Sequence, residues 1–260
     1  MFFGVNSNQF LKFIYNALLT GMPSLMNNPI NKNILHAPFT VNKYSTYINY
    51  KLDEEKIIRI NEFLENKNNG LSLSTTKLLE NSNEDYYLSI NIYNCSSPLF
   101  DFLGTSTATR CEVNVYVKDE NNEESTLIID YESNILSLDP ENLFKKSSNI
   151  VFNEDYDFIN GEIYSKNFML DFYYNKNNYY SSKLDEKLIK LSDKIYYTNG
   201  YYDKLYYDSS LIHNKIKKIK ELDFDINFKF LGLEFNNINS VFYFENKINF
   251  VGGLWHNIYD

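Results

Sequence analysis

The stretch that decides the fold is Arg110-Cys111-Glu112-Val113-Asn114-Val115-Tyr116-Val117, in which polar and apolar side chains alternate without interruption. An extended strand points successive side chains to opposite faces, so this pattern predicts a β-strand with one polar and one apolar face. The segment 87–93, Tyr-Leu-Ser-Ile-Asn-Ile-Tyr, repeats the alternation. A polar turn at 119–124 and an apolar return at 126–130 make 110–131 a predicted β-hairpin.

Shorter elements are expected on both sides of this block. Apolar residues at helical spacing predict helices at 6–19, 54–64 and 184–191, and Asp53 is placed to cap the second of them. The basic run 215–220 has the same spacing, which predicts a short helix with a solvated lysine face. Further strands are expected at 44–52, 162–167, 169–174, 227–233, 240–244 and 248–251.

The length and composition indicate a folded, β-rich protein. A chain of 260 residues that is 43% hydrophobic and 17% aromatic can bury a sizeable core. Because no fixed-period repeat or long linker divides it, residues 1–260 are expected to form one domain on which helix 6–19 packs. We therefore predict an α+β fold that is predominantly β, with a few short peripheral helices.

Charge and cysteine content narrow the class of protein. A net charge of -9 would repel a phosphate backbone, so nucleic acid is not an expected partner. Cys95 and Cys111 form no Cys-x-x-Cys pair, which favours a reducing compartment and disfavours a zinc site. The first residues lack the features of a secretion signal, and the apolar stretch 10–19 is shorter than the ~20 residues of a membrane span. We expect a cytoplasmic protein without a membrane span.

Several motifs that hold cofactors do not occur in the sequence. There is no Gly-rich phosphate loop, dinucleotide fingerprint, His-Glu-x-x-His or Gly-x-Ser-x-Gly. The three histidines, His36, His213 and His256, have no ligand spacing. The sequence therefore predicts neither a metal site nor a cofactor.

The polar face formed by Arg110, Glu112, Asn114 and Tyr116 is the first candidate site. An ion pair and two hydrogen-bonding groups on one strand face make a site if that face lines an interior. If the face points to solvent, it is an ordinary polar surface and not a site. Antiparallel sheets commonly have one solvated face. The sequence leaves both interpretations open, and a solvated face is the commoner case.

The adjacent Lys145 and Lys146 form the second candidate site. Neighbouring lysines are usually solvated. Two ammonium groups held together in an apolar pocket would instead lower the pKa of one amine and leave it nucleophilic at neutral pH.

The order of these features resembles the acetoacetate decarboxylase-like superfamily. Its early strand, short helix and Leu-rich loop correspond to 47–52, 54–64 and 71–79, and its glutamate-bearing strand to Arg110-Cys111-Glu112. Ile128-Ile129-Asp130 followed by 138–146, Leu-Asp-Pro-Glu-Asn-Leu-Phe-Lys-Lys, is similar to the family's Asp and its Gly-Arg-Glu-x-x-Gly-Phe-Pro-Lys-Lys segment. The chain departs from that segment where Leu138, Leu143 and Phe144 replace the family's Arg, Gly and Pro.

This resemblance implies an antiparallel sheet closed or partly closed into a barrel, and a decarboxylase-like lyase that needs no cofactor. Lys145 would form the Schiff base with a small or hydrophobic carbonyl compound, and Lys146 would lower its pKa. Glu112 would be the acidic residue of the site, and Asp139 would stand where the family has its motif glutamate. Arg110, Asn114 and Tyr116 would bind substrate.

Two other functions are consistent with the sequence. A non-catalytic β-barrel could bind an apolar small molecule or lipid, with aromatic side chains as its lining. An interaction protein, including a homo-oligomer, could use an exposed strand edge near Tyr173-Tyr174 or Tyr201-Tyr202. Whether Lys145 and Glu112 share one pocket is the observation that separates these functions.

Overall fold

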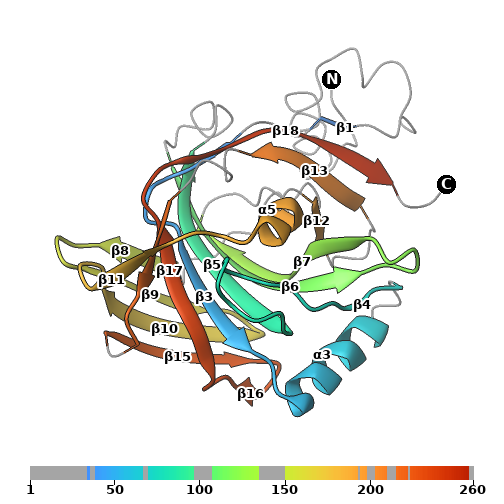
Figure 1. Ribbon diagram of the computed structural model, residues 1–260, viewed down its shortest axis with the longest axis horizontal. Coiled ribbons are helices and arrows are strands. Elements are labelled where there is room, and N and C mark those ends of the chain that lie inside the picture. The colour runs from blue at the N-terminus through green and yellow to red at the C-terminus, as the bar shows by residue number, and fades with distance from the viewer. Residues whose placement is uncertain are drawn as a thin grey trace, which may run out of the picture.

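The computed structural model describes residues 34–35, 39–66, 70–96, 107–134, 150–192, 194–197, 203–209, 215–221 and 223–257. In this part of the chain the strands form two sheets, and the helices are α3 (Glu54–Asn66) and α5 (Glu186–Ser192) (Figure 1). Neither of these helices is long and apolar enough to cross a membrane. The helix predicted at 6–19 lies outside the described residues.

The larger sheet is strongly curled. Its strands, in spatial order, are β11 (Tyr179–Ser182), β14 (Ile216–Ile219), β17 (Ile238–Phe244), β3 (Thr46–Lys51), β5 (Tyr87–Ser96), β2 (Phe39–Val41), β18 (Ile248–Asn257), β13 (Asp203–Ser209), β12 (Lys194–Tyr197), β7 (Glu124–Ser133), β6 (Ala108–Lys118) and β4 (Ser72–Leu73). The short β1 (Ile34–Leu35) pairs with β18.

Strand β5 pairs with β6 as well as with β2 and β3. The pairings therefore run from β5 through β2, β18, β13, β12, β7 and β6 and return to β5. Within this series only the β12–β7 pair is parallel. The mostly antiparallel strands and few helices confirm the predicted α+β, predominantly β class.

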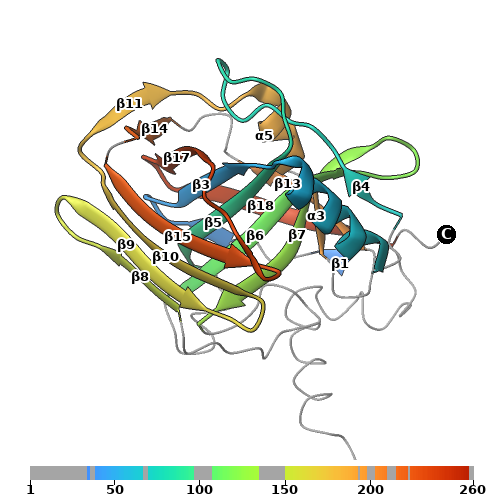
Figure 2. The ribbon, with the colours of Figure 1, turned by 90° about the horizontal axis from the view of Figure 1, so that it is seen from below.

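The smaller sheet packs on the outer face of β3, β5 and β6 (Figure 2). Its strand order is β16 (Leu233–Glu234), β15 (Phe224–Phe230), β10 (Phe168–Asn175), β9 (Phe158–Tyr164) and β8 (Ile150–Glu154). The apolar residues of the alternating block, such as Ile90 and Val113, are fully buried against Leu170 and Phe228 of this sheet. The apolar face predicted for the block is thus the centre of a two-sheet core.

The predicted hairpin is confirmed as β6 and β7. Asp119 shapes its turn, because the carboxylate Oδ1 accepts hydrogen bonds from the backbone N–H groups of Asn121 (2.9 Å) and Glu123 (2.8 Å). Asn122 adopts a left-handed φ of 61°, which Asn tolerates better than most residues. A bulge between Val113 and Asn114 shifts the register of the pair.

The helix predicted at 54–64 is confirmed as α3. The Oδ1 atom of Asp53 accepts a hydrogen bond from the N–H of Lys56 at 3.0 Å, which is the expected cap. Ile60 and Leu64 bury one side of the helix against the core shared by the two sheets. The helix predicted at 184–191 is confirmed as α5, although it begins two residues later.

The helix predicted for the basic run 215–220 is wrong, because this segment is strand β14. Residues three apart in a strand point to opposite faces, and both faces of β14 are covered. Ile216 packs with Phe244 on the face of the larger sheet that also contacts α5. Ile219 packs on the opposite face, in the core between the two sheets. The isoleucine spacing that resembles a helix face therefore comes from a strand buried on both sides, hydrogen-bonded to β11 and β17.

Some strand boundaries also differ from the prediction. The strand expected at 162–167 is β9, which runs from Phe158 to Tyr164. The next residues form a turn, because Ser165 Oγ accepts hydrogen bonds from the N–H groups of Asn167 (3.1 Å) and Phe168 (3.0 Å). The strand expected at 227–233 is β15, which ends at Phe230 before the left-handed Leu231-Gly232 turn.

Candidate functional site

The polar face of β6 is buried, and the expectation of a solvated face is wrong. Arg110 is 1% exposed, Tyr116 2%, Asn114 4% and Glu112 8%. The curl of the larger sheet brings distant strands and α5 over this face, as Figure 1 shows. Leu188 and Leu191 of α5 pack in the same cluster as Tyr116. The four side chains predicted to share a face therefore lie together in the interior.

Arg110 and Glu112 form a close ion pair at one end of this face. Arg110 Nε donates to Glu112 Oε1 at 2.5 Å, and the Tyr93 hydroxyl donates to the same oxygen at 2.9 Å. The guanidinium of Arg110 also lies over the ring of Tyr131, with its carbon 4.1 Å from the ring centroid. Because the two charged residues are two apart on one strand, the pleat itself holds them side by side.

A row of polar side chains crosses the sheet at the level of Glu112. Tyr47 is paired with Asn91, Asn91 with Glu112, and Glu112 with Tyr131 on successive strands. Asn91 Nδ2 donates to the Tyr47 hydroxyl at 3.1 Å. Burial raises the pKa of Tyr47 well above its usual value, and Tyr116 and Glu112 raise it further. The hydroxyl of Tyr47 therefore stays a neutral hydrogen-bonding group at physiological pH.

A second row lies one step along the strands. Ser89 Oγ donates to Asn49 Oδ1 at 2.7 Å and lies 2.9 Å from the Tyr116 hydroxyl. Burial raises the pKa of Tyr116, so this hydroxyl too stays protonated. Asn114 is the exception in the row, because its buried Oδ1 has no hydrogen-bond partner among the described residues. That oxygen is an acceptor available to a bound molecule.

The structure thus brings together all four strand residues that the sequence analysis singled out. It adds Tyr93, Tyr47, Asn91 and Tyr131, which were not predicted to belong to the site. The polar positions of 87–93 already contained the signal, because β5 must pair its polar face with the polar face of β6.

The remaining predicted site residues, Lys145, Lys146 and Asp139, lie outside the described part of the chain, as do His36 and His213. His256 lies in the part of β18 for which only the backbone is described. Among the described residues, no group of three or more His, Cys, Asp or Glu side chains could hold a metal ion.

This arrangement suits proton transfer and the recognition of a small polar molecule. A buried carboxylate can exchange protons with a bound substrate, and a guanidinium is the side chain best matched to a substrate carboxylate. The tyrosine hydroxyls and the amide oxygen of Asn114, which is unpaired among the described residues, can supply further hydrogen bonds.

No protein-family model matches the sequence, and neither does any curated protein. Solved structures match in fold. The acetoacetate decarboxylase of Legionella pneumophila is 13% identical, with 99% of this chain and 100% of that one covered at a TM-score of 0.51.

An acetoacetate decarboxylase-like enzyme from Sphingomonas wittichii RW1 is 5% identical, with 86% of this chain and 93% of that one covered at a TM-score of 0.51. The enduracididine biosynthesis enzyme MppR, complexed with the condensation product of pyruvate and imidazole 4-carboxaldehyde, is 9% identical over 86% of this chain and 90% of that one, at a TM-score of 0.52. These matches confirm the predicted resemblance at the level of the fold, which does not by itself establish a reaction.

Proposed function

We propose that this protein is an enzyme that acts on a small keto acid or ketone through an imine on Lys145, with Glu112 as its acid–base residue. The observation that carries the proposal is the buried Arg110–Glu112 pair. Burying two charges is costly, and an apolar pair of similar size would often be at least as stable. A binding or catalytic role accounts for keeping the charges on this face.

In the proposed reaction, the Lys145 amine adds to the substrate carbonyl carbon and water leaves to form the imine. If the substrate is a β-keto acid, its carbon–carbon bond to the carboxylate then breaks. Carbon dioxide departs, and the electron pair moves toward the protonated imine nitrogen. Protonation of the resulting enamine carbon and hydrolysis by water return the free amine, and Glu112 relays the protons. Lys146 would lower the pKa of Lys145.

The contacts of the polar face support the proposed substrate-binding roles. Arg110 is placed to share its guanidinium between Glu112 and a substrate carboxylate, since it presents several N–H donors in one plane. The free Oδ1 of Asn114 and the Tyr116 hydroxyl are placed to bind substrate donors. We assign Asp139 to the motif position of the family's glutamate on the resemblance alone.

Four further proposals accompany this function. The return of the pairings to β5 supports a sheet closed into a barrel around the polar face. The apolar core shared by both sheets supports a single domain. The free, buried thiols of Cys95 and Cys111 are compatible with a reducing cytoplasm. A homo-oligomer also remains a prediction, which sedimentation would test.

Borohydride trapping tests the imine directly. The protein is incubated with acetoacetate or pyruvate, reduced, and analysed by intact mass and peptide mapping. We expect one reduced adduct on Lys145 in the wild type and none in Lys145→Ala. The matched control is Lys166→Ala, which removes an exposed lysine in the described region and should leave the adduct unchanged. An absence of adduct with every carbonyl compound offered would rule out the imine.

A second variant separates catalysis from binding. Glu112→Gln should still form the adduct but release carbon dioxide roughly 10²–10⁴-fold more slowly, because an amide cannot exchange protons as a carboxylate does. Unchanged release would remove Glu112 from the reaction. Carbonyl compounds that bind without any adduct or turnover would instead favour the non-catalytic ligand-binding barrel.

A further inference from the structure

A hollow of about 380 Å³ lies away from the proposed site, where the β11, β14, β17, β3 and β5 part of the larger sheet meets the loop before β5. Its lining consists of Lys51, Leu79, Asn81, Ser82, Asn83, Asp85, Tyr87, Ser182, Lys218 and Asn239. On β5, Tyr87 is four residues from Asn91, the partner of Glu112, and six from Tyr93, the partner of Arg110, so roughly 13–20 Å of strand separates the hollow from the ion pair. The volume falls near the lower end of the range for small-molecule sites, about 300–1,000 Å³.

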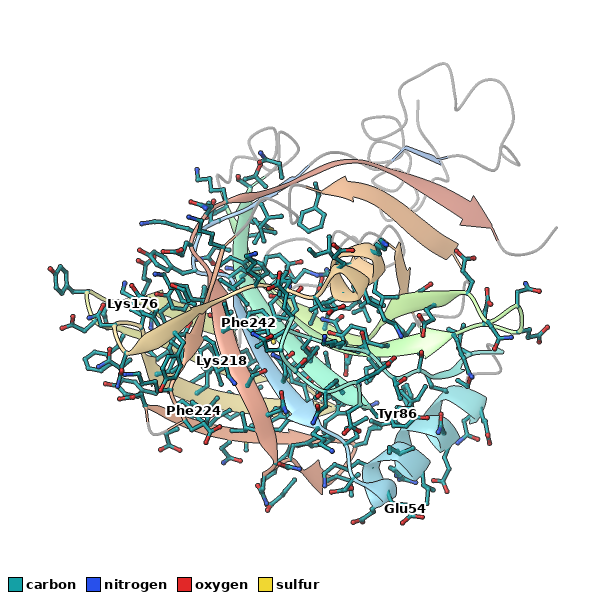
Figure 3. All side chains as sticks on the ribbon, viewed as in Figure 1. Glu54, Tyr86, Lys176, Lys218, Phe224 and Phe242 are labelled. Atoms are coloured by element: carbon teal, nitrogen blue, oxygen red, sulfur yellow. The ribbon has the colours of Figure 1, made fainter. Side chains whose placement is uncertain are left out.

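Lys218 is the unusual residue of this hollow. It lies on β14 opposite Phe242 of β17, and both residues are labelled in Figure 3. Its side chain is half-buried, yet no hydrogen bond, ion pair or aromatic ring engages its ammonium group among the described residues. By contrast, the neighbouring Lys217 pairs with Glu245 at 3.2 Å, and Lys51 pairs with Asp85. A partly desolvated ammonium without a counter-ion favours binding of an anion.

Four polar side chains of the lining are unpaired among the described residues. The side chains of Asn81, Asn83, Asn239 and Ser182 make no hydrogen bonds to other described residues. Three amides and one hydroxyl offer both donors and acceptors, which is the combination that the hydroxyl groups of a polyol require. The wall formed by Leu79 and Tyr87 gives apolar surface for a carbon skeleton. The ligand that fits this lining carries a negative group and several hydroxyls.

The charged residues that line the hollow indicate which of two hollows suits an anion and which type of anion fits it. The lining holds two lysines and one aspartate, a net single positive charge in a protein whose overall charge is -9. A second hollow, of about 630 Å³, also includes Lys218, but there two lysines face two acids, Glu221 and Asp223. An anion is therefore better compensated in the first hollow. One net positive charge matches a carboxylate better than a phosphate dianion.

We propose that this hollow binds a polyhydroxylated carboxylate, that is, a sugar acid. The carboxylate is held by Lys218, and the hydroxyl groups are held by Asn81, Asn83 and Asn239. The site does not depend on the proposed imine chemistry, because it shares no lining residue with the Arg110–Glu112 region.

Isothermal titration calorimetry of the full chain with gluconate tests this site. We expect one saturable site, glucose binding at least about tenfold more weakly, and at least about a tenfold loss in Lys218→Met, since a charge-assisted hydrogen bond is lost. Asn239→Ala should weaken gluconate severalfold. Lys166→Met and Lys145→Ala should bind gluconate as the wild type does, the second variant separating this site from the proposed function.

Four results would overturn the proposal. These are an absence of saturable heat with gluconate, equal affinity for glucose, unchanged affinity in Lys218→Met, and tighter binding of inorganic phosphate through the same residues. Thermal denaturation of each variant establishes that it is folded. If Lys218→Met does not fold, Asn239→Ala and the comparison of gluconate with glucose still decide the question.

Discussion

The buried ion pair of Arg110 and Glu112 gives the sharpest test of the structure. Arg110→Met removes the guanidinium and keeps most of the stem, and Glu112→Gln removes the charge and keeps the shape. Either change alone removes one charge of a pair that lies on a face at most 8% exposed at these positions. The double variant removes both charges together, so the three variants and the wild type form a double-mutant cycle.

Burial decides the expected magnitude. Breaking a buried pair by removing one partner typically costs about 3–5 kcal/mol, whereas an exposed pair is worth about 0–1 kcal/mol. Arg110 is 1% exposed and its Nε lies 2.5 Å from Glu112 Oε1, so each single variant should lose about 3–5 kcal/mol of unfolding free energy. The double variant should lose clearly less than the sum of the two, because it removes both members of one ion pair together.

Urea denaturation followed by circular dichroism measures these free energies. The chain supplies a matched control, since its other arginine, Arg59, pairs with Glu62 at 3.2 Å on the exposed surface of α3. Arg59→Met and Glu62→Gln should each cost no more than about 1 kcal/mol. If the Arg110 and Glu112 variants cost as little as these controls, the polar face is solvated and the argument for an interior site fails.

Three further predictions concern other parts of the molecule. Gly161→Ala should cost about 1–3 kcal/mol in thermal denaturation, because its Cβ would lie 2.5 Å from the Phe172 ring; an unchanged melting temperature would contradict this packing. Lys187→Met should destabilise the protein at pH 7, and the difference from the wild type should shrink as pH falls below 4.5 and disappear below the lowered pKa of Glu84. The Lys187 hydrogen bond holds the pKa of Glu84 below its usual value, so that stabilisation is lost as pH falls through the lowered pKa; a pH-independent difference in urea denaturation would contradict it. Burial raises the pKa of the Cys95 thiol to about 12, so a thiol reagent should modify it only after unfolding, and rapid modification of the native protein would show that the site is open.

The alternating block could be interpreted from the sequence because its structure is largely local. Period-two alternation specifies a strand, and the polar turn at Asp119 places the two strands of the hairpin side by side. Helix α3 was equally accessible, since the Asp53 cap and the apolar spacing of Ile60 and Leu64 are short-range features.

The surroundings of the polar face could not be predicted in the same way. They depend on β12, β13 and β18, which are far from β6 in the sequence, and on a parallel pairing that sets Tyr196 against Leu127. Such long-range pairings do not produce any periodic pattern in the sequence of β5 and β6. The helix prediction for β14 was wrong for a related reason. Ile216 and Ile219 are buried on opposite faces of this strand, and their spacing matches that of a helix face.

The alternation in β5 and β6 is unusual because both faces of these strands are buried. A strand covered on both sides usually has an almost continuous apolar sequence, because every side chain is removed from water. Here Leu88, Ile90 and Ile92 follow that rule toward the smaller sheet, whereas Ser89 and Asn91 on the opposite face remain polar although buried. Each buried polar group costs free energy unless it is hydrogen-bonded, and this face satisfies most of its groups through side chains of neighbouring strands. Stability alone would replace the face with valine and leucine, so its retained polarity is the strongest argument that the curled sheet encloses a functional site.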